Sequence, residues 1–83
     1  MRVIDEFSSG GMRFSIFYMN QKFIVKCELN NLEQLFKVSE LQFVFNGLED
    51  LKKSVLNPQV LEKIRKNFDE LQKTADMITE SFA

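Results

Sequence analysis

The chain has 83 residues, enough for one domain with a modest hydrophobic core. Hydrophobic residues make up 45% of it and charged residues 28%, a composition typical of globular rather than disordered proteins. The net charge of −1 comes from signs spread evenly along the sequence, which argues against a general binder of duplex DNA or anionic membranes.

Residue types that support most catalytic and metal sites are scarce. The absence of histidine excludes the usual imidazole base, His-containing triads and most zinc and haem sites. The single cysteine, Cys27, can form neither an internal disulfide nor a zinc or iron–sulfur site. A domain this small without an internal disulfide fits a reducing compartment. We therefore predict a non-enzymatic protein with no cofactor and no metal.

We expect no signal peptide and no membrane span. Asp5 and Glu6 stand where a signal peptide would be apolar, and no stretch approaches the roughly 20 apolar residues of a membrane span. We expect a cytoplasmic protein that does not associate with membranes.

Residues 2–38 alternate between apolar and polar with a period of two, which is typical of half-buried β-strands. Three turn signals divide this stretch: the Ser-Ser-Gly-Gly loop at 8–11, Asn20-Gln21 and Asn30-Asn31. Glycine and asparagine tolerate the positive φ that tight hairpins require. The pattern predicts four antiparallel strands, at about 2–7, 12–19, 22–29 and 32–38.

The two asparagine turns determine the register of the last three strands. With two-residue loops, Tyr18 faces Phe23 and Val25 faces Phe36, so both hairpins place their apolar residues on one face. There Cys27 is expected to be a small core residue rather than a nucleophile, because burial raises the pKa of a thiol. The predicted core face consists of Phe14, Ile16, Tyr18, Phe23, Val25, Cys27, Leu29, Leu32, Phe36 and Val38.

The opposite face of the predicted sheet mixes cations with apolar side chains. On an open sheet such a surface can stack bases and follow a phosphate backbone. Alternatively, the 41–45 segment, a helix or a second subunit covers it. Glu28 and Glu33 face each other here, and we expect Arg13 to neutralise them, with Glu6 placed opposite Arg13, rather than a metal ion. The candidate nucleic-acid or partner face consists of Arg13, Phe17, Lys22, Ile24, Lys26, Leu35 and Lys37.

Helical signals dominate the C-terminal half. Residues 41–45 alternate like a strand but adjoin helical sequence, so both assignments remain open. Asn46 with Glu49 resembles a capping box and predicts a short helix over 47–56. Pro58 breaks helical geometry at Asn57 and suits the start of a second helix over 58–81.

The second helix carries apolar residues at heptad spacing. Its 24 residues span about 36 Å, whereas four strands are only about 19 Å wide, so the part from Ala75 onward should extend past the sheet. An apolar stripe that is not covered within one chain predicts a homodimer. The candidate dimer residues are Leu71, Ala75, Ile78 and Phe82.

Four antiparallel strands followed by a kinked helical segment, over residues 2–82, resemble the Whirly and coactivator-type single-stranded-DNA-binding fold. The resemblance is one of topology. It implies dimerisation through the helix and single-strand binding on the sheet face, with Arg13, Phe17, Lys22, Lys26 and Lys37 as contacts. The acidic balance and the single outward aromatic residue, Phe17, depart from that pattern.

The sequence thus predicts one α+β domain over 1–83, a four-stranded antiparallel β-meander followed by two C-terminal helices (ββββαα), the last one long. The favoured function is a non-enzymatic homodimeric protein-interaction or regulatory module, with a further protein as partner. The alternative is single-stranded nucleic-acid binding on the lysine-ringed outer face. An enzyme that uses carboxylates and a divalent metal is a third and weaker hypothesis.

Overall fold

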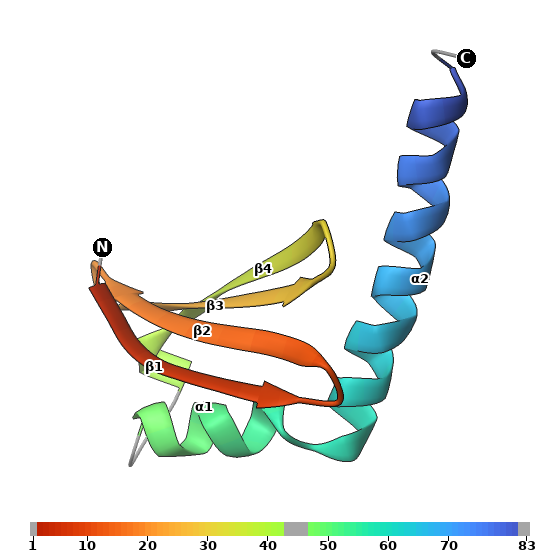
Figure 1. Ribbon diagram of the computed structural model, residues 1–83. Helices are drawn as coiled ribbons and strands as arrows, with labels where there is room; N and C mark the ends of the chain where they lie inside the picture. Colours follow the sequence, from red (N-terminus) through yellow and green to blue (C-terminus); the bar gives the residue numbers. More distant parts are fainter. Residues whose placement is uncertain (1, 43–46, 82–83) are drawn as a thin grey trace.

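The computed structural model describes residues 2–42 and 47–81 as one sheet followed by helices (Figure 1). The strands pair antiparallel in the order β1-β2-β3-β4, and the predicted ββββαα arrangement is confirmed. The elements are β1 (Arg2–Ser9), β2 (Met12–Met19), β3 (Lys22–Leu29), β4 (Leu32–Ser39), the 3₁₀ turn η1 (Glu40–Gln42), α1 (Gly47–Val55) and α2 (Pro58–Glu80).

Two-residue turns join all four strands. Asn20 and Gln21 have φ of 52° and 60°, so the β2–β3 turn is left-handed at both positions. The predicted register is confirmed, with Tyr18 opposite Phe23 and Val25 opposite Phe36.

The first hairpin is tighter than predicted. Its loop is Gly10-Gly11 alone, with φ of 57° and 80°, and β1 continues to Ser9 instead of ending near residue 7. Two glycines suffice because they supply the positive φ by themselves. The pairing of Glu6 with Arg13 was therefore wrong: Glu6 lies opposite Ser15, and Ser8 lies opposite Arg13.

A β-bulge interrupts β1 at Ile4. Val3 pairs with Phe17, but Asp5 pairs with Ile16, so one residue of β1 is left between the two pairs. Directly paired residues share a face, so Asp5, which pairs with Ile16 in the unbroken register from the first turn, lies on the side that carries Ile16.

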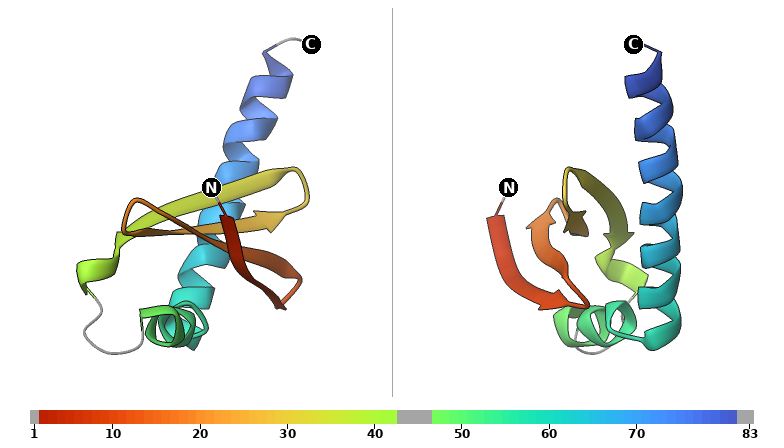
Figure 2. Two further views of the ribbon diagram at one scale, coloured as in Figure 1. Left: turned by 90° about the vertical axis from the view of Figure 1, so that its left-hand side faces the viewer. Right: turned by 45° about the vertical axis from the view of Figure 1, so that its right-hand side comes forward.

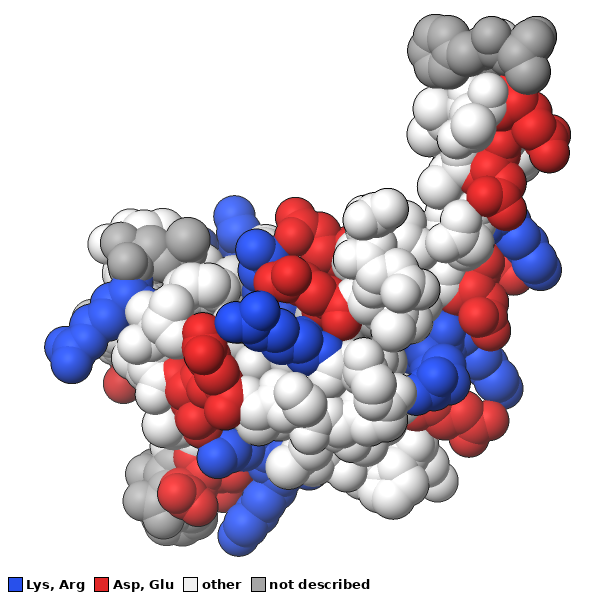
Figure 3. Space-filling model, in the orientation of Figure 1, with Lys and Arg blue, Asp and Glu red and all other residues white. Residues whose placement is uncertain are grey.

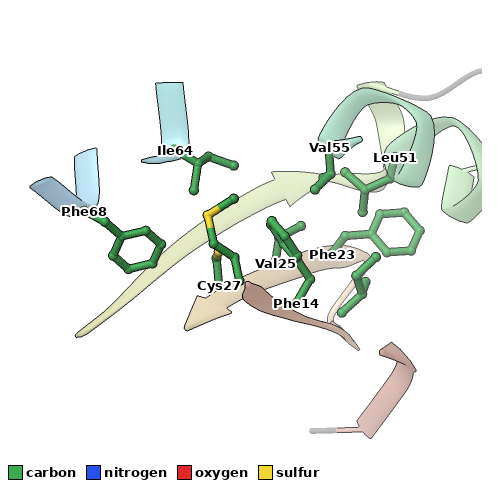
Figure 4. Close-up of a cluster of buried hydrophobic side chains, with 10 residues drawn as sticks. Phe14, Phe23, Val25, Cys27, Leu51, Val55, Ile64 and Phe68 are labelled. Atoms are coloured by element: carbon green, nitrogen blue, oxygen red, sulfur yellow. The ribbon is translucent and has the colours of Figure 1, made fainter. Parts of the chain in front are cut away.

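The core lies between that side of the sheet and both helices (Figure 2). Figure 4 shows Ile64 and Phe68 of α2 and Leu51 and Val55 of α1 directed toward the strands. The buried cluster comprises Met12, Phe14, Ile16, Phe23, Val25, Cys27, Leu51, Val55, Ile64 and Phe68. Four other predicted core residues are partly buried and pack against this cluster: Tyr18, Leu29, Leu32 and Val38. The remaining one, Phe36, departs from the prediction. Phe36 is 38% exposed, because it lies on the edge strand β4, where the helices do not close over it.

Asn57 separates the two helices, as predicted. Its backbone is non-helical (φ −59°, ψ 128°), its side-chain oxygen accepts a hydrogen bond from the Gln59 amide at 2.9 Å, and Pro58 begins α2. The possible capping residue Asn46 and most of the ambiguous 41–45 segment lie outside the described residues; Leu41 belongs to η1.

Polar contacts hold the first half of α2 against the sheet. Gln34 of β4 donates to the Ile64 carbonyl at 2.9 Å and accepts from Asn67 at 3.2 Å. Arg65 donates to the carbonyl of Gly10 in the β1–β2 turn. Beyond Phe68, α2 projects past the sheet, and the molecule measures 51 × 27 × 19 Å as a result (Figures 1 and 2).

Candidate interaction surfaces

The outer sheet face is the side of the sheet opposite the helices. The structure brings all seven predicted residues of this face together on β2, β3 and β4: Arg13, Phe17, Lys22, Ile24, Lys26, Leu35 and Lys37. They are not equally accessible. Ile24 is only 4% exposed, whereas Leu35 is 50% exposed. Phe17, Ile24 and Lys37 form one row across the strands, so the apolar centre of the face is narrow.

Ion pairs engage two of the four cations of the outer sheet face, Arg13 and Lys26. The ammonium of Lys26 lies 3.5 Å from Glu28 and 3.4 Å from Glu33, and the hydrogen bond to Glu33 is the main cause that raises the pKa of Lys26. The expected neutraliser, Arg13, instead lies 4.0 Å from Glu6. The correction follows from the pleat: Lys26 precedes Glu28 by two positions on the same face of β3 and reaches both carboxylates.

This pairing matters for nucleic-acid binding. Lys26, the cation at the middle of the face, is already engaged by two carboxylates. Figure 3 shows red and blue side chains intermingled over the sheet, without an extended patch of one sign. The outer sheet face therefore offers a phosphate backbone less attraction than its lysine content suggests.

The projecting half of α2, residues 69–80, carries the predicted dimer residues. Ile78 is 58% exposed, Leu71 is 36% exposed and Ala75 is partly exposed. At 100° per residue they continue the stripe of Ile64 and Phe68, which is buried against the strands in the first half of the helix. Phe82, the fourth candidate, lies outside the described residues.

An apolar groove runs beside the edge strand β4, between the sheet and the two helices. We call it the edge groove. It has a volume of about 440 Å³. Its walls are Val25, Phe36 and Val38 from the strands, Leu51 and Val55 from α1, and Val60 and Ile64 from α2, with Ser54, Gln59, Lys63 and Asn67 among its polar lining.

Sequence reasoning missed the edge groove. Phe36 and Val60 each fit a regular pattern of buried residues, yet both are more than a third exposed. Whether the apolar stripes of β4 and α2 meet or leave a gap depends on the position and angle at which α2 crosses β4. No local sequence pattern predicts that crossing. The excess of apolar side chains over what one small core can hide was the only hint.

The side chain of Cys27 lies in the core. Burial raises the pKa of the Cys27 thiol to about 11, in keeping with its predicted role in the core. Over residues 2–42 and 47–81, no three potential ligands cluster closely enough to hold a metal ion. Neither α1 nor α2 combines the length and hydropathy needed to cross a membrane.

Comparisons with protein-family models, with curated proteins and with solved structures find no match for this chain.

Proposed function

We propose that this protein is a non-enzymatic homodimeric protein-interaction module that self-associates through the projecting half of α2. One observation carries the proposal: the apolar stripe of α2 continues past the edge of its own sheet with Leu71 and Ile78 exposed. A second copy is the simplest partner, because one contact with two-fold symmetry buries the stripe of both subunits.

The size of the stripe limits how it can act. Full burial of a leucine or isoleucine contributes about 1.5–3 kcal/mol. Leu71 and Ile78 are already partly covered, so four such side chains in a dimer contribute about 5 kcal/mol. Micromolar affinity requires about 8 kcal/mol after the costs of association. The stripe therefore needs to pack on another apolar surface rather than on itself alone.

The test compares two neighbouring substitutions on the projecting helix. Ile78→Asp places a charge in the stripe and should shift the protein from dimer to monomer in sedimentation velocity. Met77→Asp is the matched control: Met77 is 68% exposed but lies 100° around the helix, so the dimer should persist. Both changes add the same charge near the C-terminus of α2, which removes helix propensity and dipole effects from the comparison. A wild-type chain that is monomeric at 100 µM (roughly the range in which weak dimers form) overturns the proposal.

Single-stranded nucleic-acid binding on the outer sheet face is the second candidate function. It is favoured by the placement of both helices on the other face, which leaves Phe17 and Lys37 in one row on either side of Ile24. Phe17→Ala and Lys37→Glu should then weaken binding to a labelled oligonucleotide, and added salt should weaken it further. Lys63→Glu, on α2, is the control with the same change of charge. No binding at low salt removes this candidate.

A further inference from the structure

We propose that the edge groove binds the second copy. The projecting half of α2 of one subunit lies in the edge groove of the other, with the two α2 helices antiparallel. The inference rests on the proposed homodimer and specifies its contact. It joins three features of the molecule that lie along one helix: the exposed stripe, the edge groove and a separation of charge.

The charges of α2 are segregated by half. Residues 58–68 contain three bases and one acid, a net charge of +2, whereas residues 69–80 contain four acids and one base, a net charge of −3. Lys66 pairs with Glu62 at 3.2 Å and Lys73 with Glu70 at 3.3 Å. The other charged residues of α2 take part in none of the ion pairs that the structure describes. They are Lys63 and Arg65 in the first half and Asp69, Asp76 and Glu80 in the second half.

This segregation selects the antiparallel arrangement. In a parallel pair, basic halves meet basic halves and acidic halves meet acidic ones. In an antiparallel pair each acidic projecting half lies beside the basic half that borders the groove, and the helix dipoles also oppose each other. Figure 3 shows the same division along α2, with red side chains predominating toward its projecting end and an uncharged strip on the side nearer the sheet.

The apolar positions fit this arrangement. At 100° per residue, Val60, Ile64, Leu71 and Ile78 fall within about 40° of one another around α2, and Val60 and Ile64 line the groove. Val60 and Ile78 are equidistant from Asp69 along the helix, as are Asn67 and Leu71. A two-fold axis that crosses α2 at the level of Asp69, on the side of the apolar stripe, therefore sets Ile78 of one copy against Val60 of the other.

The edge groove supplies the apolar surface that the stripe lacks. Its walls come from both sheet and helices, and Phe36 and Val60 are exposed to 38% and 39%. Filling it with Leu71 and Ile78 of the second copy covers the exposed residues of both surfaces at once.

Disulfide trapping tests the contact. In the full chain, Val60→Cys/Ile78→Cys should oxidise to a covalent dimer. The two positions lie about 27 Å apart within one α2, so they can join only between copies. Cys27 is buried with a raised thiol pKa and should stay unreactive. The matched control is Glu62→Cys/Asp76→Cys, which has the same symmetry about Asp69 but lies on the far side of α2 and should give no covalent dimer.

The outcomes separate this inference from the proposed dimer. A wild-type chain that sediments as a monomer removes both. If the wild type is a dimer and the single variant Ile78→Cys forms a covalent dimer, the two helices are parallel. That result overturns the antiparallel contact, while the proposed function stands. A wild-type dimer in which Val60→Cys/Ile78→Cys cross-links no better than the control shows that something other than the second copy's helix occupies the groove.

Discussion

Single residues determine how α1 sits under the sheet. The ammonium of Lys52 lies 2.7 Å from the carboxylate of Asp5 and 5.5 Å from the centre of the Phe7 ring. That ring stacks on Phe14 with centroids 5.1 Å apart, which continues the contact into the core. Asp5 and Phe7 are two positions apart on β1 and face the same side of the sheet, the side that carries Ile16 and Phe14, so both can contact Lys52 of α1.

The Asp5–Lys52 pair should make stability depend on pH. The hydrogen bond from Lys52 is the main cause that lowers the pKa of Asp5 below 3.8. A lowered pKa in the folded state means that the pair stabilises the fold above about pH 4, and that this contribution is lost as the pH falls through the folded value. The free energy of unfolding of wild type should therefore fall more steeply than that of Asp5→Asn between roughly pH 5 and pH 2.

Glu6→Gln provides the control for that titration. Glu6 is the next residue, but its pair with Arg13 is 4.0 Å long and both side chains are more than half exposed. Such pairs contribute little, so urea unfolding of Glu6→Gln should follow wild type at every pH. Equal pH dependence of Asp5→Asn and wild type would show that the Lys52 contact is not maintained in solution.

At the scale of elements, the hairpins hold the sheet in one register. Their turns differ in backbone strain. Glycine occupies both left-handed positions of the β1–β2 turn, whereas Gln21 has a φ of 60° in the β2–β3 turn. A side chain with a Cβ pays a conformational cost there that glycine does not. The β2–β3 turn is thus the strained one, although it joins two strands of the buried core.

Gln21→Gly should stabilise the protein. It converts the turn to Asn-Gly, the preferred sequence for this geometry, and we expect the free energy of unfolding to rise by about 1 kcal/mol. Asn31→Gly is the matched control: Asn30 has a φ of 56°, but Asn31 does not have a positive φ, so glycine there should give no gain. Urea unfolding measures both, and equal effects would contradict the assignment of strain to Gln21.

At the scale of the whole molecule, the fold divides α2 into two parts with different surroundings. The first part buries Ile64 and Phe68 and is tied to the sheet through Gln34. The second part has no sheet beneath it. An isolated helix end of about a dozen residues is marginal in water, so its stability should depend on the second copy.

The melting temperature should therefore depend on protein concentration. Dimerisation stabilises the folded state by mass action, and for a chain of this length a tenfold increase in concentration should raise the melting temperature by about 4 °C. Ile78→Asp should abolish this dependence, whereas Met77→Asp should retain it. Calorimetry over a hundredfold concentration range makes the comparison, and a concentration-independent wild type would speak against a dimer.

Much of the fold could be predicted because its determinants are local. Asn20-Gln21 and Asn30-Asn31 specify tight turns, a tight turn specifies a register, and the register assigns Phe14, Val25 and Cys27 to one face. Pro58 and the apolar spacing specify α2 in the same way. The length of α2 relative to the sheet follows from helix and strand dimensions, so its projection was predictable as well.

The tertiary structure alone decided which groups meet across elements. The alternation of residues specifies the two faces of β3. It does not specify that Lys26, in place of Arg13, pairs with Glu28 and Glu33, because the ion pairs of long side chains depend on distances in the folded sheet. Likewise the sequence by itself determined the apolar stripes of β4 and α2, but not the edge groove between them. A stripe is a property of one element, which periodicity reports, whereas a gap depends on the packing of sheet, α1 and α2 together.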